Sequence, residues 1–226
     1  MLAVLRVLQF GDSMLPIGAF SFSNGLESAV ATGLVRDEST LREFVYTVVE
    51  QAATGDCIAL LHAHRAAARH DLAAVVLADQ AVMRRKLNEE MRLMTVRMGR
   101  KFGELGEFVH SVPLMNGWLE AIKTGATPGT FVAGVAVLLA GLGISERECF
   151  AVHQYGVATM VLGAALRLMK INHLTTQAIL FAVNGEAPAA FARIAGCTLD
   201  DMATFAPVAD VLAAIHVKAH VRMFMN

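Results

Sequence analysis

The sequence predicts an all-α fold, and two observations support this prediction. Apolar residues recur at the spacing of one helix face, as at Leu41, Val45, Val48 and Ala52. Strand signals are weak, because no sustained polar–apolar alternation appears and no Asn-Gly pair lies between β-branched runs. We expect one helical-bundle-like domain of about ten helices over residues 1–226.

The N-terminal part begins with a short apolar helix, followed by a long loop at residues 11–27, GDSMLPIGAFSFSNGLE. The loop is rich in glycine and serine, carries two phenylalanines, and is too apolar for an ordinary linker. Asn24 and Glu27 have the spacing of an N-cap and its N3 partner, which predicts a helix from about Gly25. The serines are expected to satisfy backbone groups in turns.

The next helix is predicted from a capping motif and a terminating glycine. Thr40 and Glu43 match the S/T-x-x-E capping box, and Gly55 is placed to end the helix in a left-handed conformation. Ser145 and Glu148 form a second such box, which opens a long helix to about residue 170. The other expected helices cover residues 57–69, 72–86, 108–123, 131–142, 174–183, 189–194 and 208–224.

A methionine stripe is predicted between residues 83 and 102. Its apolar side chains are expected to pack in the core, although flexible methionines could instead line an adaptable partner groove. Basic side chains cover the remaining surface of this segment, whereas residues 1–60 carry three basic and seven acidic side chains. This asymmetry suggests two surfaces that meet partners of opposite charge. The stripe comprises Met83, Leu87, Met91, Met94, Met98 and Phe102.

The composition, 55% hydrophobic with 17% charged residues, allows either a membrane protein or a protein with apolar partner surfaces. The uncharged run 124–145 starts with a breaker cluster, and the run 149–166 contains polar groups that are costly in lipid. We therefore expect no membrane span. Three widely spaced cysteines, without a CxxC pair, favour a reducing cytoplasm, and the apolar N-terminus lacks the basic region and cleavage site of a signal peptide.

Motifs of catalysis and ligand binding are missing from the sequence. It has no Walker A, GxGxxG, HExxH or G-x-S-x-G pattern, and a net charge of −1 gives no general attraction to nucleic acid. The histidine pairs 62/64 and 216/220 lack a third ligand nearby, so we expect no tight metal site. We expect a protein that is not an enzyme and has no cofactor of its own.

The stretch LQFGDSMLPIGAFSFSNGLESAV resembles the N-terminal signature of UreF-type urease accessory proteins, S-x-L-P-x-G-x-F-x-x-S-x-G-L-E. The run AALRL at 164–168 and Gln177 resemble a later segment of that family. The ending HVKAHVRMFMN resembles the family's C-terminus, where His216, Arg222 and Phe224 match best.

The resemblance implies an all-α homodimer without catalysis of its own. It implies an adaptor and regulator between a UreG-type GTPase and a UreD/UreH-type protein that docks on apo-urease, in a complex that delivers nickel. The complex, rather than this chain, would handle the nickel. The residues expected to bind partners are Pro16, Phe20, Phe22, Glu27, His216, Arg222 and Phe224.

Two other functions stay open on the sequence. The same fold could serve as a chaperone or adaptor for a different metalloenzyme. A helical enzyme that uses its serines or histidines is the third alternative, which the lack of a clustered acid, base and nucleophile disfavours.

Overall fold

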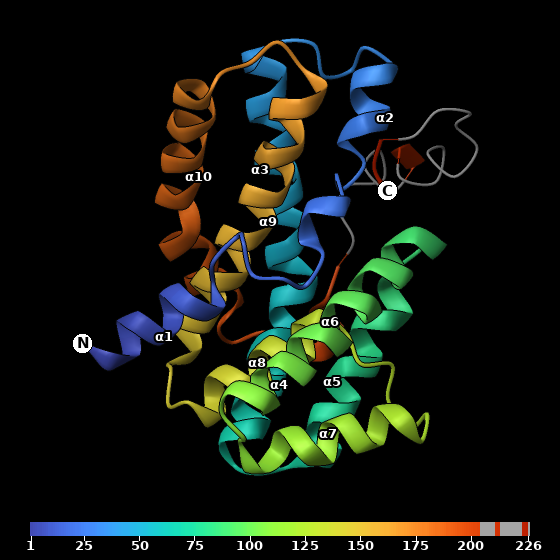
Figure 1. The fold of residues 1–226 in the computed structure, drawn as a ribbon, viewed down its shortest axis with the longest axis vertical. Coiled ribbons are helices and arrows are strands. Elements are labelled where there is room, and N and C mark those ends of the chain that lie inside the picture. Colours follow the sequence, from blue (N-terminus) through green and yellow to red (C-terminus); the bar gives the residue numbers. More distant parts are fainter. Residues whose placement is uncertain (204–210, 213–222, 226) are drawn as a thin grey trace.

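The computed structural model describes residues 1–203, 211–212 and 223–225, and within these residues all regular structure is helical. The all-α prediction is therefore confirmed. Figure 1 shows α2, α3, α9 and α10 standing side by side in one half, with α4 to α8 in the other half. The helices are α1 Leu2–Phe10, α2 Leu26–Ala31, α3 Glu38–Thr54, α4 Asp56–Ala68, α5 Leu72–Arg85, α6 Glu89–Val109, α7 Pro113–Lys123, α8 Phe131–Gly141, α9 Glu146–Leu168 and α10 His173–Ile194, with 3-10 turns η1 Ala19–Ser21 and η2 Leu199–Asp201.

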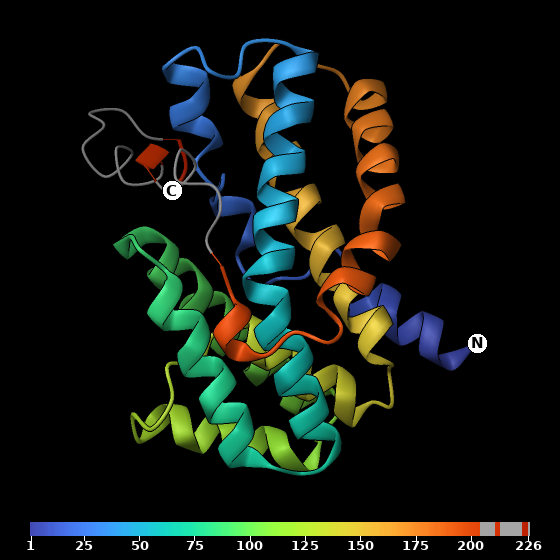
Figure 2. The same cartoon turned by 180° about the vertical axis from the view of Figure 1, so that it is seen from behind.

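The two halves are connected by α9 and by the direct junction between α3 and α4. The first half of α9, including Phe150, packs into the cluster around α4 and α8, and its second half, including Leu162, packs with α3 and α10. Seen from behind in Figure 2, α3 leads directly into α4, with only Gly55 between them. These shared helices favour one domain over residues 1–226, which stays a prediction.

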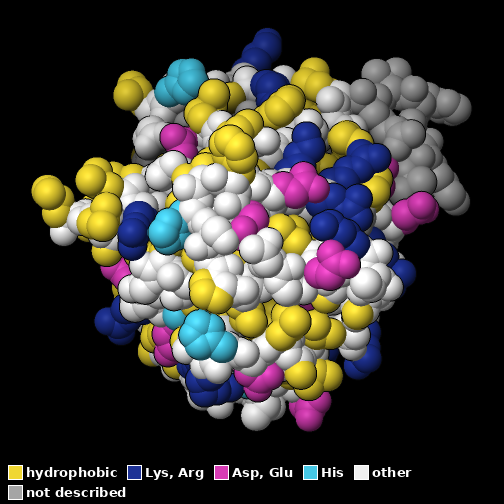
Figure 3. All heavy atoms as spheres, turned by 60° about the horizontal axis from the view of Figure 1, so that its bottom comes forward, with side chains coloured by type: hydrophobic (Ala, Val, Ile, Leu, Met, Phe, Trp, Pro, Cys, Tyr) yellow, Lys and Arg dark blue, Asp and Glu magenta, His cyan; other side chains and the backbone are white. Residues whose placement is uncertain are grey.

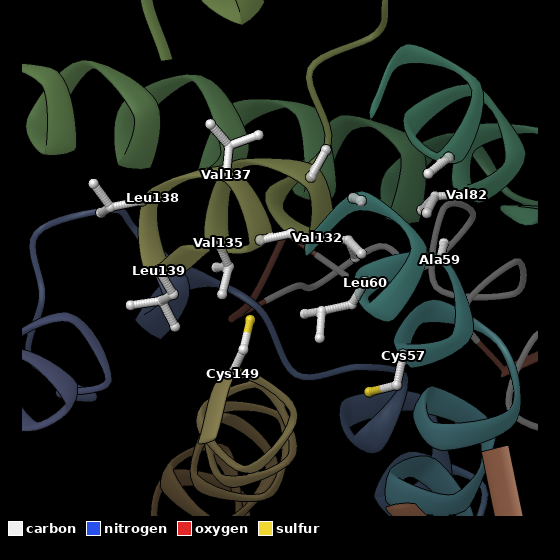
Figure 4. Close-up of a cluster of buried hydrophobic side chains, with 14 of the residues drawn as sticks. Cys57, Ala59, Leu60, Val82, Val132, Val135, Val137, Leu138, Leu139 and Cys149 are labelled. Atoms are coloured by element: carbon white, nitrogen blue, oxygen red, sulfur yellow. The ribbon is translucent and has the colours of Figure 1, made fainter. Parts of the chain in front are cut away.

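The core around α8 accounts for the apolar residues of the uncharged run 124–145. Every residue from Val132 to Leu139 is buried. Figure 4 shows side chains of α4 and α8, among them Leu60 and Val135, pointing into the space between the two helices. Each fully buried aliphatic side chain of this kind contributes roughly 1.5–3 kcal/mol relative to its exposed state.

The inner face of α6 confirms the core interpretation for part of the methionine stripe. Met94, Met98 and Phe102 are buried against α8. Gly99 permits the close approach of the chain before α8, since a Cβ atom there would lie 2.2 Å from the Gly129 carbonyl oxygen. The stripe does not continue to Met83 as predicted, because the helix breaks at Lys86 and Asn88 caps a new one.

Several predicted boundaries are wrong, and each has a local cause. The capping box of α3 is formed by Asp37 and Thr40, one turn earlier than the predicted Thr40 and Glu43. Gly55 ends α3 as predicted, but with φ −105° rather than in the left-handed region. Pro113 begins α7, a position where its missing N–H costs nothing.

The region after α9 holds one helix where two were predicted. α10 runs without interruption through Pro188. Proline has no N–H, so the carbonyl four residues earlier loses its helical hydrogen bond. Because Pro188 lies on the exposed face, that carbonyl is open to water. The capping box of Ser145 and Glu148 is confirmed at the start of α9. The expected helix 208–224 falls largely outside the described residues.

Candidate partner-binding site

The loop between α1 and α2 owes its glycines to its backbone conformation. Gly18 and Gly25 have φ values of 86° and 81°, a left-handed region that favours glycine. Ile17 and Phe22 bury their side chains in the core and hold the loop against the protein. The loop is therefore a fixed element of the fold rather than a linker.

The end of the chain is bound to this loop and to α2, beside which it lies in Figure 1. The Glu27 carboxylate accepts hydrogen bonds from the backbone N–H of Met223 at 2.7 Å and of Phe224 at 3.0 Å. The Met225 N–H donates to the Ser21 carbonyl at 2.8 Å. A negatively charged acceptor makes such hydrogen bonds stronger than neutral ones.

Arg167 on α9 joins the loop to the end of the chain. Its Nη2 donates to the Phe20 carbonyl at 2.8 Å, and its guanidinium carbon lies 4.1 Å from the centre of the Phe224 ring. That ring is only 4% exposed. Partial burial lowers the pKa of Arg167, although an arginine in this position keeps its charge at neutral pH.

We call this arrangement the loop–tail surface, formed by residues 11–27, Arg167 and residues 223–225. Its most exposed ring is that of Phe20, at 72%. The backbone that carries this ring is held by hydrogen bonds to the Phe20 and Ser21 carbonyls. Pro16 and Met14, in the same loop, are also exposed. An exposed ring on a fixed backbone can bind a partner at little cost in conformational entropy.

The predicted partner-binding residues take different positions. Pro16 and Phe20 face solvent, whereas Phe22 is 3% exposed and belongs to the core. Glu27 does not act as the N3 partner of Asn24, because Gly25 is the N-cap and the Glu27 carboxylate binds the end of the chain.

Phe224 contacts Arg167 and the Glu27 carboxylate within the same chain. His216 and Arg222 lie outside the described residues. Arg167 was not assigned a role from the sequence, although the run that resembles the family contains it. Its contacts depend on residues far away in the chain, so no local pattern indicates them.

A cavity of about 410 Å³ lies beneath the loop, with walls from α3, α6, α8 and α9. His153 lines it, and its Nδ1 lies 3.5 Å from the Cys57 sulfur. Burial lowers the pKa of His153 and raises that of Cys57. Both groups are therefore neutral near pH 7, which does not give an activated thiolate.

The histidines of the pairs 62/64 and 216/220, at which we expect no tight metal site, contact carbonyl groups where the structure describes them. His62 contacts the Cys197 carbonyl at 2.9 Å, and His64 contacts the Ile144 carbonyl at 2.8 Å. Within the described part of the chain, no three His, Cys, Asp or Glu side chains lie close enough to share a metal ion. His216 and His220 fall outside that part.

Two segments, Glu38–Ala68 and Glu146–Leu168, are long and apolar enough to cross a membrane. Their most apolar windows are 56% and 50% buried inside the protein. The uncharged run 124–145 contains only the shorter helix α8, Phe131–Gly141.

Comparison with known proteins gives extensive similarity. A family model described as UreF matches residues 35–184. The chain is 55% identical over 223 residues to "Urease accessory protein UreF 1" of Brucella melitensis, a match that covers 99% of this chain and 92% of that relative. It is 50% identical over 224 residues to "Urease accessory protein UreF" of Yersinia enterocolitica, covering 99% and 98%. The similarity thus covers nearly the whole chain, including the loop and α9.

Proposed function

Because this chain belongs to the UreF family of urease accessory proteins, we propose that it acts as an adaptor and regulator of a UreG-type GTPase. In this proposal it joins the GTPase to a UreD/UreH-type protein, and through that protein to apo-urease. Nickel is the cargo of the complex, and this chain contributes binding surfaces rather than catalysis. The three cysteines form no disulfide, which supports a cytoplasmic location.

The observation that carries the proposal is the exposed Phe20 ring on a fixed loop. Aromatic rings are enriched among the residues that dominate binding energy at protein interfaces. The Arg167 and Met225 hydrogen bonds hold the backbone at Phe20 and Ser21, so the ring is presented in one place. We assign the loop–tail surface to the UreD/UreH-type partner.

Phe20→Ala tests this assignment. We expect the affinity for the UreD/UreH-type protein from the same source to fall by about 2 kcal/mol, or about thirtyfold, as for an interface hot spot. The melting temperature should stay unchanged, because the ring is mostly exposed. Leu77→Ala, an exposed apolar residue on α5, is the matched control. Wild-type affinity of Phe20→Ala would refute the assignment.

The biological role is tested in a host whose urease gene cluster lacks its own UreF-type gene. The chain is supplied with the GTPase and the UreD/UreH-type protein from its source, with nickel in the medium. Restored urease activity would support urease as the client. If the accessory proteins bind one another but pull-downs from the native cell recover a different metalloenzyme, that enzyme is the client instead.

We also propose a homodimer through the outer face of α10. Leu174, Ala178, Phe181 and Gly185 follow the i, i+4, i+7, i+11 spacing and are all exposed, Leu174 and Phe181 by 83% and 84%. Exposed apolar patches of this kind mark protein interfaces. Phe181→Asp should convert a dimer into a monomer in sedimentation velocity, whereas Leu77→Asp should not. A dimer that survives Phe181→Asp would contradict this interface.

A further inference from the structure

The outer face of α6 carries a cationic strip made of Arg97, Arg100 and Lys101, all exposed. It spans about 6 Å along the helix, since each residue rises about 1.5 Å. In Figure 3, Lys and Arg side chains gather in one group on the side where the first half of α6 lies.

The cations of the strip have no ion-pair partner among the described residues. Several other cations are paired, for example Lys86 with Asp56 at 2.7 Å and Arg193 with Glu50 at 2.7 Å. Arg97 and Lys101 are four residues apart on one helix face, where like charges destabilise a helix. The strip is thus not explained by the stability of α6.

The strip is continuous with the loop–tail surface. Arg97 Nη1 lies 3.8 Å from the Met225 sulfur, and the Met225 N–H binds the Ser21 carbonyl next to Phe20. A partner that covers Phe20 and the end of the chain therefore reaches α6 at Arg97.

We infer that the cationic strip binds an acidic surface on the same partner that docks on the loop–tail surface, and that it accelerates the encounter. This inference rests on the proposed function of the loop–tail surface. A protein suits the strip better than nucleic acid does, because exposed Leu93 and Phe108 flank the cations on the same helix face. Arginine with aromatic residues is the composition of protein interfaces, and the charges are too few for a long polyanion.

The cationic strip and Phe20 should affect different rate constants of binding. Charges at the edge of an interface change the association rate and its salt dependence, whereas anchors at its centre change the dissociation rate. The strip should therefore set the association rate, and Phe20 the dissociation rate.

The test measures both rates for the wild-type UreD/UreH-type protein from the same source, at about 0.05 M and about 0.5 M salt, where screening lengths differ severalfold. The variant is Arg97→Gln, Arg100→Gln and Lys101→Gln combined. The control, Arg36→Gln, Arg69→Gln and Lys123→Gln combined, removes the same charge at exposed positions elsewhere.

At low salt we expect the strip variant to associate about tenfold more slowly than wild type, with dissociation unchanged within about twofold. The difference should vanish at high salt, and the control variant should behave as wild type. Phe20→Ala should show the opposite pattern, with faster dissociation and an unchanged association rate. An association rate that falls no more in the strip variant than in the control would overturn the inference and leave the proposed function intact. A wild-type protein that does not bind this partner would refute both.

Discussion

Glu27 binds the end of the chain, and Glu27→Ala is expected to release it. The carboxylate accepts two backbone hydrogen bonds, from Met223 and Phe224. A hydrogen bond to a charged group contributes roughly 1.5–3 kcal/mol, and the two could give about 3 kcal/mol. Met223 is exposed, so its N–H can bind water instead. We therefore expect Glu27→Ala to reduce the free energy that holds residues 223–225 in place by about 2 kcal/mol, or about thirtyfold in the equilibrium between bound and released states.

Amide hydrogen exchange of residues 223 and 224 measures this loss directly. In Glu27→Ala, exchange at both amides should become about thirtyfold faster, because protection depends on the free energy of local opening. Glu27→Gln keeps one neutral acceptor oxygen, so the free energy of local opening at these residues should fall by only about 1 kcal/mol. Global unfolding in denaturant should change little in either variant, since the contact ties down a terminal segment.

Glu43→Ala on α3 is the matched control, since Glu43 is an exposed carboxylate that accepts no hydrogen bond from the described residues. Unchanged exchange at residues 223 and 224 in Glu27→Ala would refute the reasoning. So would a large loss of global stability, which would make Glu27 a core element of the fold. If the prediction holds, Glu27→Ala should also weaken binding of the partner assigned to the loop–tail surface.

Two further predictions concern buried polar groups. Asp79 is fully buried and accepts four hydrogen bonds, from Trp118 Nε1, the Thr127 hydroxyl and the N–H groups of Gly129 and Thr130. Asp79→Asn places an NH₂ group against these donors and should cost about 3 kcal/mol in urea unfolding; wild-type stability would contradict this. Burial lowers the pKa of His64 below its ordinary value of 6.5, so the unfolded chain binds protons more readily and stability falls as pH drops below about 6.5. His64→Gln should flatten this loss between about pH 7 and 5, and an unchanged slope would refute the assignment.

Features that depend on neighbours along the chain could be predicted from the sequence. Ser145 and Glu148 are three residues apart, so their capping box follows from the local pattern, and it is formed at the start of α9. The buried face of α6 with Met94 and Met98 follows from helical spacing in the same way. The N-terminal motif indicated the family before any tertiary contact was known.

Even local signals failed where two of them competed. Asp37 and Thr40 form a capping box that overlaps the predicted pair Thr40 and Glu43, and Asp is a better N-cap residue than Thr. The predicted break between helices 174–183 and 189–194 is absent, because Pro188 lies on an exposed face of α10, which the sequence does not reveal. Burial decides such cases, and burial is a property of the assembled fold.

The loop–tail surface was decided by the tertiary structure alone. Glu27 lies 196 residues from Met223, and Arg167 lies 147 residues from Phe20. Local rules assign Glu27 to a helix cap, which it does not form, because its carboxylate binds two backbone N–H groups at the other end of the chain. A hydrogen bond depends on distance in space, and only the packing of α2 and α9 brings these distant groups within reach of one another.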